Sequence, residues 1–405
     1  MSRGFASPWS AEDGGPARQQ RAGDRPPTGT LQATVRRTLM STMTVLGAPG
    51  EVFLLTHSAL RANFGLPTTA QVERIDPVTL QTCAASPRLP GGPMWPGGMA
   101  VHPNGDLYVV YGRWLHRLDR DCQVKGALEL PIKAPWNSFV ILDCGLIATK
   151  NLSDNVPARL TLVDPDTLTE VAALTLPEAS VARLSAVGDT VYVVGVDSIR
   201  RVHWHGGALV LEPAWHWAYR EGTGNSHGWD AVIAAGSAWF MDNGAHRYRT
   251  SMTGAGVAKT PNRLLRISVD DSADHAAVAV SGLPGGSITN PPLVDPDRRI
   301  VIAYDSANRM LQAFDLALKS LWQRRDIGCA SHMLLFPDSG TIITNDHGRG
   351  GEWVVTMDIV TGAERGRVRL GGLMQGVVFP SPGWQDDLYW CGMDKVARVF
   401  SQSPL

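Results

Sequence analysis

The feature that most constrains the fold of this chain is a strand ending that recurs eight times along it. Each copy alternates apolar and polar residues, and most copies end in Asp, as in Leu115–Asp119 (LHRLD) and Val354–Asp358 (VVTMD). The fourth residue of each five-residue ending serves as a reference point, and successive reference points are 43, 45, 39, 65, 47, 43 and 42 residues apart. This period is typical of propeller blades, in which four-stranded sheets pack around a central axis. We therefore predict an all-β fold, an eight-bladed β-propeller of four-stranded antiparallel blades.

The two ends of the chain decide how the ring closes. The last repeat supplies only three strands before the chain ends. We predict that an N-terminal strand, Thr30–Thr38, completes this blade and closes the ring, because closure removes an exposed sheet edge. Residues 30–405 are thus predicted to be a single eight-bladed propeller domain. Residues 1–29, rich in Gly, Pro and Arg, are predicted to be a disordered N-terminal tail.

Composition narrows the range of partners. The formal net charge is −1 and charges of both signs are mixed along the chain, which argues against nucleic acid or an anionic membrane as a partner. No apolar run approaches the length of a transmembrane helix, and no signal peptide is visible. The five cysteines are scattered singly, which is typical of free thiols in a reducing compartment. We therefore expect a cytoplasmic protein that acts on a small molecule.

Three connections are longer than the repeat requires. They are Ser58–Gln71, Trp217–His227 and Gly244–Asn262. In a propeller, the connections into the first strand of a blade and out of its second strand lie on the same face of the ring. All three long connections are therefore predicted on one face, where binding and catalytic groups are usually found.

In each blade we count residues back and forward from the turn between the first two strands. The count locates the ends of those strands on the face that carries the long connections. Imidazoles and carboxylates are over-represented at these positions and in the loops beside them, and such groups bind divalent metals or act as acids and bases near neutral pH. The predicted metal ligands are His57, His227, His332, His347 and Asp305. The predicted acid–base residues are His246, Asp346 and Asp242. The predicted substrate-binding residues are Asn137, Asn243, Asn290, Gln375, Lys150, Arg113 and Trp229.

Two parts of the repeat resemble known propeller families. The segments LQAFDLALKSLW (311–322) and VVTMDIVTGAERGRVRL (354–370) resemble the repeats of quinoprotein-type (PQQ-repeat-like) propellers, and HPNGDLYVV (102–110) is similar to the strand–turn–strand of gluconolactonase-type propellers. Likeness to the quinoprotein alcohol dehydrogenases would imply a quinone held over two adjacent, disulfide-bonded cysteines. No two cysteines are adjacent here, so we expect no quinone cofactor, and no motif predicts a nucleotide cofactor.

These observations favour an enzyme acting on a small organic molecule at the central pore mouth, either a metal-assisted or a His/Asp acid–base hydrolase or lyase. A divalent metal ion would be its cofactor in the first case. Two alternatives stay open. One is a non-catalytic propeller that binds a protein or peptide, and the other is a redox enzyme with a bound organic cofactor.

Overall fold

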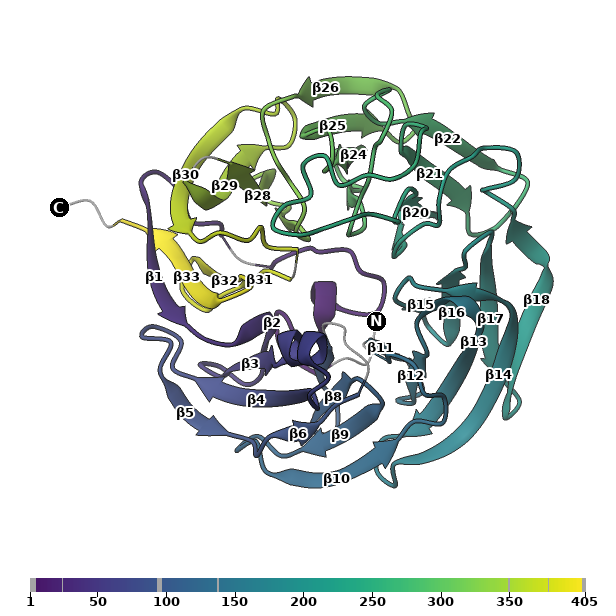
Figure 1. The fold of residues 1–405 in the computed structure, drawn as a ribbon, viewed down its shortest axis with the longest axis vertical. Helices are drawn as coiled ribbons and strands as arrows, with labels where there is room; N and C mark the ends of the chain where they lie inside the picture. Colours follow the sequence, from purple (N-terminus) through teal and green to yellow (C-terminus); the bar gives the residue numbers. More distant parts are fainter. Residues whose placement is uncertain are drawn as a thin grey trace.

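The computed structural model is an eight-bladed β-propeller, and it describes residues 5–23, 25–92, 97–136, 138–348, 350–377 and 379–402. Eight separate antiparallel sheets surround one axis (Figure 1). Seven sheets have four strands, and the blade that begins at Met40 has a fifth short strand, β6 (Leu89–Pro90), paired with its third. The predicted fold class and blade number are confirmed.

The strands occupy four positions from the axis to the rim. The innermost strands are β2 (Met40–Leu46), β7 (Gly98–Val101), β11 (Phe139–Ile141), β15 (Ser185–Val187), β19 (Val232–Ala234), β23 (Leu293–Asp295), β27 (Leu334–Phe336) and β31 (Ser381–Pro382). The second strands are β3 (Val52–His57), β8 (Leu107–Tyr111), β12 (Ile147–Lys150), β16 (Thr190–Val194), β20 (Ser237–Met241), β24 (Ile300–Asp305), β28 (Thr341–Gly348) and β32 (Asp387–Cys391). The third strands are β4 (Thr69–Ile75), β9 (Trp114–Leu118), β13 (Ser153–Asp164), β17 (Ile199–His205), β21 (Arg263–Ser268), β25 (Met310–Asp315), β29 (Gly351–Asp358) and β33 (Lys395–Ser401). The outer strands are β5 (Thr82–Ala85), β10 (Val124–Glu129), β14 (Thr169–Ser180), β18 (Ala208–Trp217), β22 (His275–Ala279), β26 (Ser320–Arg324), β30 (Glu364–Gly371) and β1 (Leu31–Arg37).

Strand β1 closes the ring as predicted. It pairs with β33 along its whole length, in a register that runs from Leu31 opposite Ser401 to Arg37 opposite Lys395. The last blade therefore has the order β1-β33-β32-β31, with its outer strand supplied by the N-terminal part of the chain. This pairing leaves no unpaired strand edge where the two ends of the ring meet.

The recurring Asp has a local structural role. Asp164 Oδ1 accepts hydrogen bonds from the backbone N–H groups of Asp166 (3.0 Å) and Thr167 (2.8 Å), and Asp358 Oδ1 does the same for Val360 and Thr361. A side-chain oxygen that caps a turn in this way explains why Asp follows the third strand so often. The turns it caps lie on one face of the ring, which we call the turn face. The opposite face, which carries the long connections, we call the loop face.

Two 3-10 helices interrupt the strand pattern. Helix η2 (Ala59–Phe64) lies in the long connection after β3, and Figure 1 shows it close to the middle of the ring. Helix η1 (Glu12–Gly14) belongs to the N-terminal segment. Among the described residues, no helix is long and apolar enough to cross a membrane.

The N-terminal segment takes a different course from the disordered tail that its composition predicts. Residues 5–23 lie inside the ring, where Figure 1 shows this purple segment and η1 in the middle of the propeller. Trp9 and Ala22 are each 1% exposed, and both belong to the same apolar core as strands of the first, second, seventh and eighth blades. The tail does not need apolar periodicity to be ordered, because the ring provides the surfaces that bury it.

Candidate functional site

The N-terminal segment forms a floor across the centre of the ring, toward the turn face. Its backbone carbonyls accept hydrogen bonds from inner strands of five blades, at N–O distances between 2.7 and 3.0 Å. The donor–acceptor pairs are Leu46–Trp9, Val101–Ser10, Ala186–Pro16, Ile233–Ala17 and Leu335–Gln20. Inner strands have a free edge toward the axis, so the segment satisfies backbone groups that would otherwise be unpaired. The floor is thus built by strand-edge pairing, and its side chains are free for other contacts.

Three ionisable side chains of this floor are buried beside the axis. The Arg18 guanidinium contacts both carboxylates of the segment, with Nη1 against Glu12 Oε1 and 2.8 Å from Asp13 Oδ2. It also donates to the carbonyl of Leu184 (2.7 Å) and to Ser138 Oγ (2.9 Å), which anchors the floor to the wall of the ring. A charge-assisted network of this kind is costly to bury unless every partner is in place.

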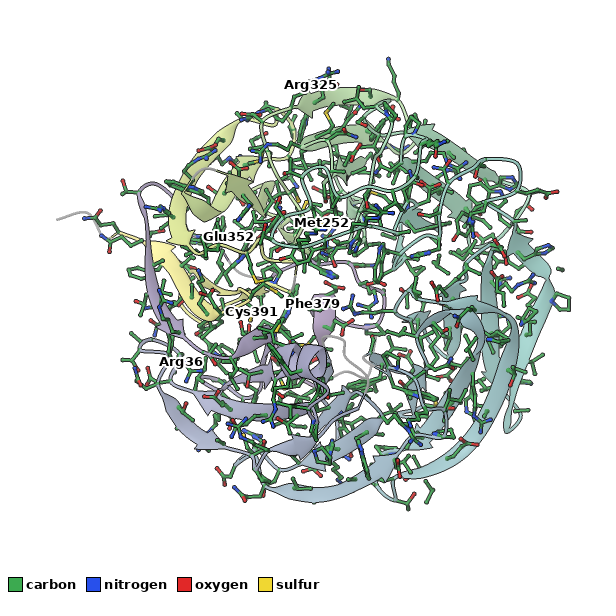
Figure 2. All side chains as sticks on the ribbon, in the orientation of Figure 1. Arg36, Met252, Arg325, Glu352, Phe379 and Cys391 are labelled. Atoms are coloured by element: carbon green, nitrogen blue, oxygen red, sulfur yellow. The ribbon has the colours of Figure 1, made fainter. Side chains whose placement is uncertain are left out.

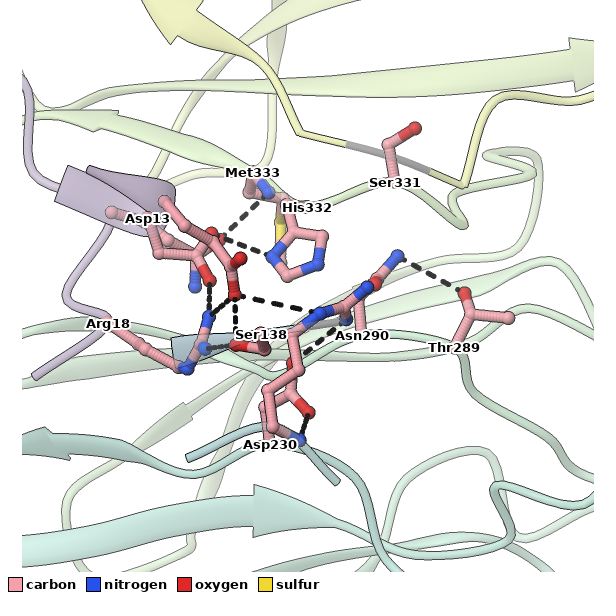
Figure 3. Close-up of polar contacts among 12 residues, drawn as sticks. Asp13, Arg18, Ser138, Asp230, Thr289, Asn290, Ser331, His332 and Met333 are labelled. Atoms are coloured by element: carbon pink, nitrogen blue, oxygen red, sulfur yellow. Dashed lines mark hydrogen bonds and ion pairs between the residues drawn. The ribbon is translucent and has the colours of Figure 1, made fainter. Parts of the chain in front are cut away.

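The wall of the ring contributes a second buried ion pair. The Arg183 backbone N–H donates to Asp230 Oδ1 at 2.6 Å, and its guanidinium lies 3.2 Å from Asp230 Oδ2. Arg183 Nε is 3.6 Å from Glu12 Oε1, so the two ion pairs approach each other (Figure 3). Asn290 also reaches this region, where its Nδ2 donates to the carbonyl of Ala330. Floor and wall therefore form one polar cluster, which we call the axial cluster.

Asp13 and His332 form a carboxylate–imidazole pair within the axial cluster. His332 Nδ1 lies 2.7 Å from Asp13 Oδ1, and the imidazole is fully buried. Its ring packs on Phe379 at a centroid distance of 3.9 Å, and the Arg183 guanidinium lies 4.7 Å from the same phenyl ring. Figure 2 places Phe379 near the axis. Among the described residues, His332 Nε2 has no hydrogen-bond partner, so this nitrogen is available to another group.

Burial and charge act in opposite directions on the carboxylates of the axial cluster. Burial alone would raise the pKa of Asp13, but His332 and Arg18 outweigh it and hold that pKa below its usual value. For Asp230, the charges of Arg183 and Arg18 likewise outweigh burial, and the pKa is lowered. For Glu12, burial prevails over Arg18 and Arg183, and its pKa is raised. The cluster therefore combines two firmly ionised carboxylates with one that takes up a proton more readily.

A cavity borders the axial cluster on the side of the second and third blades. Its volume is about 390 Å³, and Glu12 and Arg18 are among the residues that line it. Its apolar lining includes Phe5, Met99 and Phe139. A space of this size, with apolar walls and a few charged groups, is large enough for a small organic molecule.

Lys150, at the end of β12, is a buried amine near the same charges. It is 2% exposed, and its Nζ donates to the carbonyl of Ser180 at 3.1 Å. Burial lowers its pKa to about 7, with Asp230 opposing this shift and Arg183 adding to it. Within the described residues Lys150 has no ion-pair partner, so a large part of its population is neutral at physiological pH.

Lys150→Met is expected to stabilise the protein at neutral pH more than at pH 10. The pKa of Lys150 is about 7 in the folded protein and about 10.4 in an unfolded chain. Between these values the unfolded state binds more protons, so the stability that wild type owes to this residue falls as the pH is lowered from 10 to 7. Thermal unfolding of both proteins across this range measures the difference. Lys395→Met is the control, because buried Lys395 forms an ion pair with Asp394 at 3.2 Å and should stabilise the fold across the whole pH range. An effect of Lys150→Met that does not change with pH would contradict the prediction.

The predicted metal ligands do not come together. Within the described parts of the chain, no three His, Cys, Asp or Glu side chains are arranged to hold a metal ion. His57 packs near Tyr111, His227 near Trp229, and His347 borders a separate surface pocket. The Asp305 carboxylate already accepts hydrogen bonds from Ser281, Ser287 and Asn308. The structure keeps these residues apart because His57, His347 and Asp305 lie on second strands of different blades, one strand further from the axis than the position of His332.

The predicted acid–base residues have structural partners in this structure. Asp242 is paired with Arg263, with Oδ2 2.6 Å from Nη2. Asp346 lies between two guanidinium groups, 3.0 Å from Arg309 and 3.4 Å from Arg367. His246 Nδ1 accepts a hydrogen bond from the backbone N–H of Tyr248, and burial lowers its pKa. The structure places none of the three in the axial cluster.

The predicted substrate-binding residues divide into two groups. Asn290 lies in the axial cluster and Lys150 interacts electrostatically with it, whereas Asn137 lies outside the described residues. The others hold loops or neighbouring strands. Asn243 bonds Thr260 and Ser226, Gln375 bonds Gly328 and Met252, Arg113 bonds Leu130 and Glu129, and Trp229 is packed in the core.

Sequence reasoning missed the groups that the floor contributes. Glu12, Asp13, Arg18 and Gln20 lie in a segment whose composition predicts disorder, and Arg183 and Asp230 carry no motif of their own. The only available signal was a pair of adjacent carboxylates near a tryptophan in an otherwise Gly- and Pro-rich stretch. That signal does not show that the segment enters the ring.

No protein-family model and no curated protein matches this sequence. Solved structures with a similar fold include a quinohaemoprotein alcohol dehydrogenase from Comamonas testosteroni, with a TM-score of 0.71 and 11% identity over 98% of this chain and 81% of that one. A europium-containing methanol dehydrogenase gives 0.67 and 10% over 98% of each chain. Dihydro-haem d1 dehydrogenase NirN, solved in complex with DHE, gives 0.54 and 16% over 79% of this chain and 66% of that one.

The three similar structures named above correct two functional predictions. They are all redox enzymes, which contradicts the prediction of a hydrolase or lyase and favours the redox alternative. They also contradict the expectation that no quinone cofactor is involved, since the alcohol dehydrogenase among them is a quinohaemoprotein. The absence of adjacent cysteines was too narrow a criterion. It excludes one kind of contact to a cofactor, but it does not exclude a cofactor held at the axis by other residues. At these identities the likeness itself establishes the fold alone.

Proposed function

We propose that this protein is a redox enzyme that oxidises a small organic molecule with an anionic organic cofactor of the quinone or haem class, held at the axis. The observation that carries the proposal is the Asp13–His332 pair, which is buried at the axis with Nε2 unpartnered among the described residues. The fold likeness to alcohol and methanol dehydrogenases supports a redox reaction. The neighbouring cavity of about 390 Å³ provides room for a small molecule.

The residues present fit an anionic, planar group. Arg183 Nε is a buried nitrogen without a hydrogen-bond acceptor among the described residues and can donate to a carboxylate, whereas His332 Nε2, also without a partner there, is left to take a proton. Phe379 is an aromatic surface between them, in contact with the imidazole and the guanidinium. Lys150 and Arg18 add positive potential nearby. Arg183 and Phe379 are therefore the residues that would hold the cofactor.

The bound cofactor would supply the two-electron chemistry, and the chain would handle the proton. Oxidation of an alcohol to a carbonyl compound removes two electrons and two protons, and one of those protons leaves the hydroxyl oxygen. Asp13 Oδ1 lies 2.7 Å from His332 Nδ1, and this contact holds the ring so that Nε2 is the atom that takes the hydroxyl proton. Burial of the pair excludes bulk water from this transfer.

Cofactor binding is the first test of the proposal. The purified protein is expected either to show visible absorbance or to bind added pyrroloquinoline quinone or haem saturably, with quenching of tryptophan fluorescence. Bound protein should then reduce an artificial electron acceptor when a primary alcohol is added. Arg183→Met should weaken binding, whereas Arg200→Met, which removes a cation at the edge of β17, should not. Absence of both absorbance and binding would contradict the proposal.

A cytoplasmic location belongs to the same proposal. It is supported by the five cysteines, all of which are free thiols in the structure. Cell fractionation tests it, and recovery of the protein outside the cytoplasm would contradict it.

A further inference from the structure

The most exposed large apolar side chains gather on the loop face. Phe64, in η2, is 79% exposed, and Leu373, in the connection from β30 to β31, is 88% exposed. Other exposed apolar residues on loops of this face are Leu60, Leu66, Val257 and Leu283. Large apolar residues on or next to the turn face are less exposed, at most 54%, and they include Val78, Val187, Val360 and Leu321. Protruding Phe and Leu side chains of this kind mark an interaction surface more often than a solvated one.

The loop face is also rich in cations that lack an ion-pair partner. Arg61 is next to Leu60 and three residues from Phe64, and Arg247, Arg249 and Lys259 lie in the longest loop, between β20 and β21. All of these are exposed, and within the described residues none forms an ion pair. Further exposed and unpaired cations on the connections and strand ends of this face are Arg88, Lys133 and Arg369.

The fold itself produces this separation of charge. The recurring Asp that caps the turn after most third strands places carboxylates on the turn face, as at Asp76, Asp119 and Asp315. Positive side chains lie in the loops at the other end of the blades. The turn-capping carboxylates and the unpaired cations named above therefore lie at opposite ends of the blades, although the loop face also carries exposed carboxylates such as Asp154 and Glu221. A prediction made from the order of charges in the sequence does not detect this sorting.

We propose that the loop face binds an anionic lipid membrane surface, with Phe64 and Leu373 inserted among the lipids and the unpaired Arg and Lys side chains against the headgroups. Leu60, Phe64 and Leu66 project from the connection between β3 and β4, whereas Val257, Leu283 and Leu373 each project from a different loop. A fluid lipid surface accepts scattered side chains of this kind, whereas a folded protein partner requires a packed, contiguous patch. Each basic residue near an anionic membrane adds to the attraction. This inference does not rest on the redox function.

Vesicle flotation tests the proposal on the full-length chain. Wild type is expected to float with phosphatidylcholine vesicles that contain phosphatidylserine, and to bind pure phosphatidylcholine much less. Phe64→Ser combined with Leu373→Ser should weaken the binding about tenfold or more, because each side chain loses its transfer from water into lipid. Arg247→Gln combined with Arg249→Gln should weaken it by about fivefold per charge at low salt, and added salt should weaken the binding of wild type.

Matched variants on the turn face provide the control. Val360→Ser removes an exposed apolar residue, and Arg299→Gln removes an exposed cation that has no ion pair within the described residues, so neither should change flotation. Equal binding of wild type and the loop-face variants to both kinds of vesicle would overturn the proposal, as would no binding at all. Failure to bind vesicles together with Phe64-dependent binding of polyglutamate would overturn it in favour of an acidic protein partner.

Discussion

Arg18→Met is expected to lower the free energy of unfolding by about 3–5 kcal/mol, the cost of leaving buried charges without their partner. The Arg18 guanidinium is 1% exposed and bonds Glu12, Asp13, Ser138 and the carbonyl of Leu184. Methionine fills a similar volume but satisfies none of these acceptors. Because protonation relieves an unpaired carboxylate, the loss should be smaller at pH 5 than at pH 8. Urea unfolding followed by tryptophan fluorescence measures it.

Arg21→Met is the matched control in the same segment. Arg21 pairs with Asp297 at 2.6 Å, but the Asp297 side chain is 62% exposed, so this ion pair is on the surface. Its loss is expected to cost less than about 1 kcal/mol. A small effect for both variants would mean that the N-terminal segment does not dock inside the ring in solution. A large effect for Arg18→Met alone would confirm that the floor is part of the folded domain.

The scaffold could be predicted from the sequence because each blade repeats the same local physics. Alternating strands bury the faces of the sheets, and an Asp after the third strand caps the turn, as at Asp164 and Asp358. Both features recur at the blade period and are visible without a structure. The closing strand could be predicted for a different reason, since the eighth blade lacked a fourth strand and Leu31–Arg37 was the nearest candidate.

The floor could not be predicted because its interactions leave no periodic pattern. It binds the inner strands through backbone carbonyls, which every residue has, as in the bonds to Trp9 and Gln20. Its side chains are held by contacts with residues more than a hundred positions away, such as the hydrogen bond to Ser138 and the ion pair with His332. Composition describes such a segment as disordered, since it lacks enough apolar residues to fold alone. It becomes ordered only because the ring surrounds it.

The sequence predicted which end of the axis the candidate site residues lie toward. It did not predict how far each residue lies from the axis. Counting residues from each turn identified the loop-face ends of the first two strands, and these include His332 and Asn290, which the structure brings into the axial cluster. The same count could not separate first strands from second strands by radius. His347 and Asp305 therefore appeared to share a site with His332, although they lie further out and have their own neighbours.

Because floor and wall meet in the axial cluster, its chemistry depends on both ends of the chain. Asp13 comes from the first residues and His332 from the seventh blade, and the pair exists only when the ring is closed around the segment. Truncation of the N-terminal segment would therefore remove a carboxylate from the proposed proton-transfer pair as well as the floor. Substitutions in the floor are expected to lower stability and activity together. Substitutions at His332 are expected to lower activity while the protein still folds.

His332→Gln is expected to lower kcat by about 10²–10⁴-fold once the cofactor is bound, with little change in KM or in cofactor affinity. Glutamine can still donate a hydrogen bond to Asp13 but cannot take a proton, so it removes the base and keeps the packing on Phe379. Dye-linked turnover of a primary alcohol measures the loss, and thermal unfolding confirms that the variant folds. His347→Gln, on the surface of the seventh blade, should leave turnover unchanged.

If Asp13 acts through His332, adding Asp13→Asn to His332→Gln should lower kcat little further than His332→Gln alone. Full turnover by His332→Gln, or losses that simply multiply, would show that the imidazole packs the site without carrying the proton.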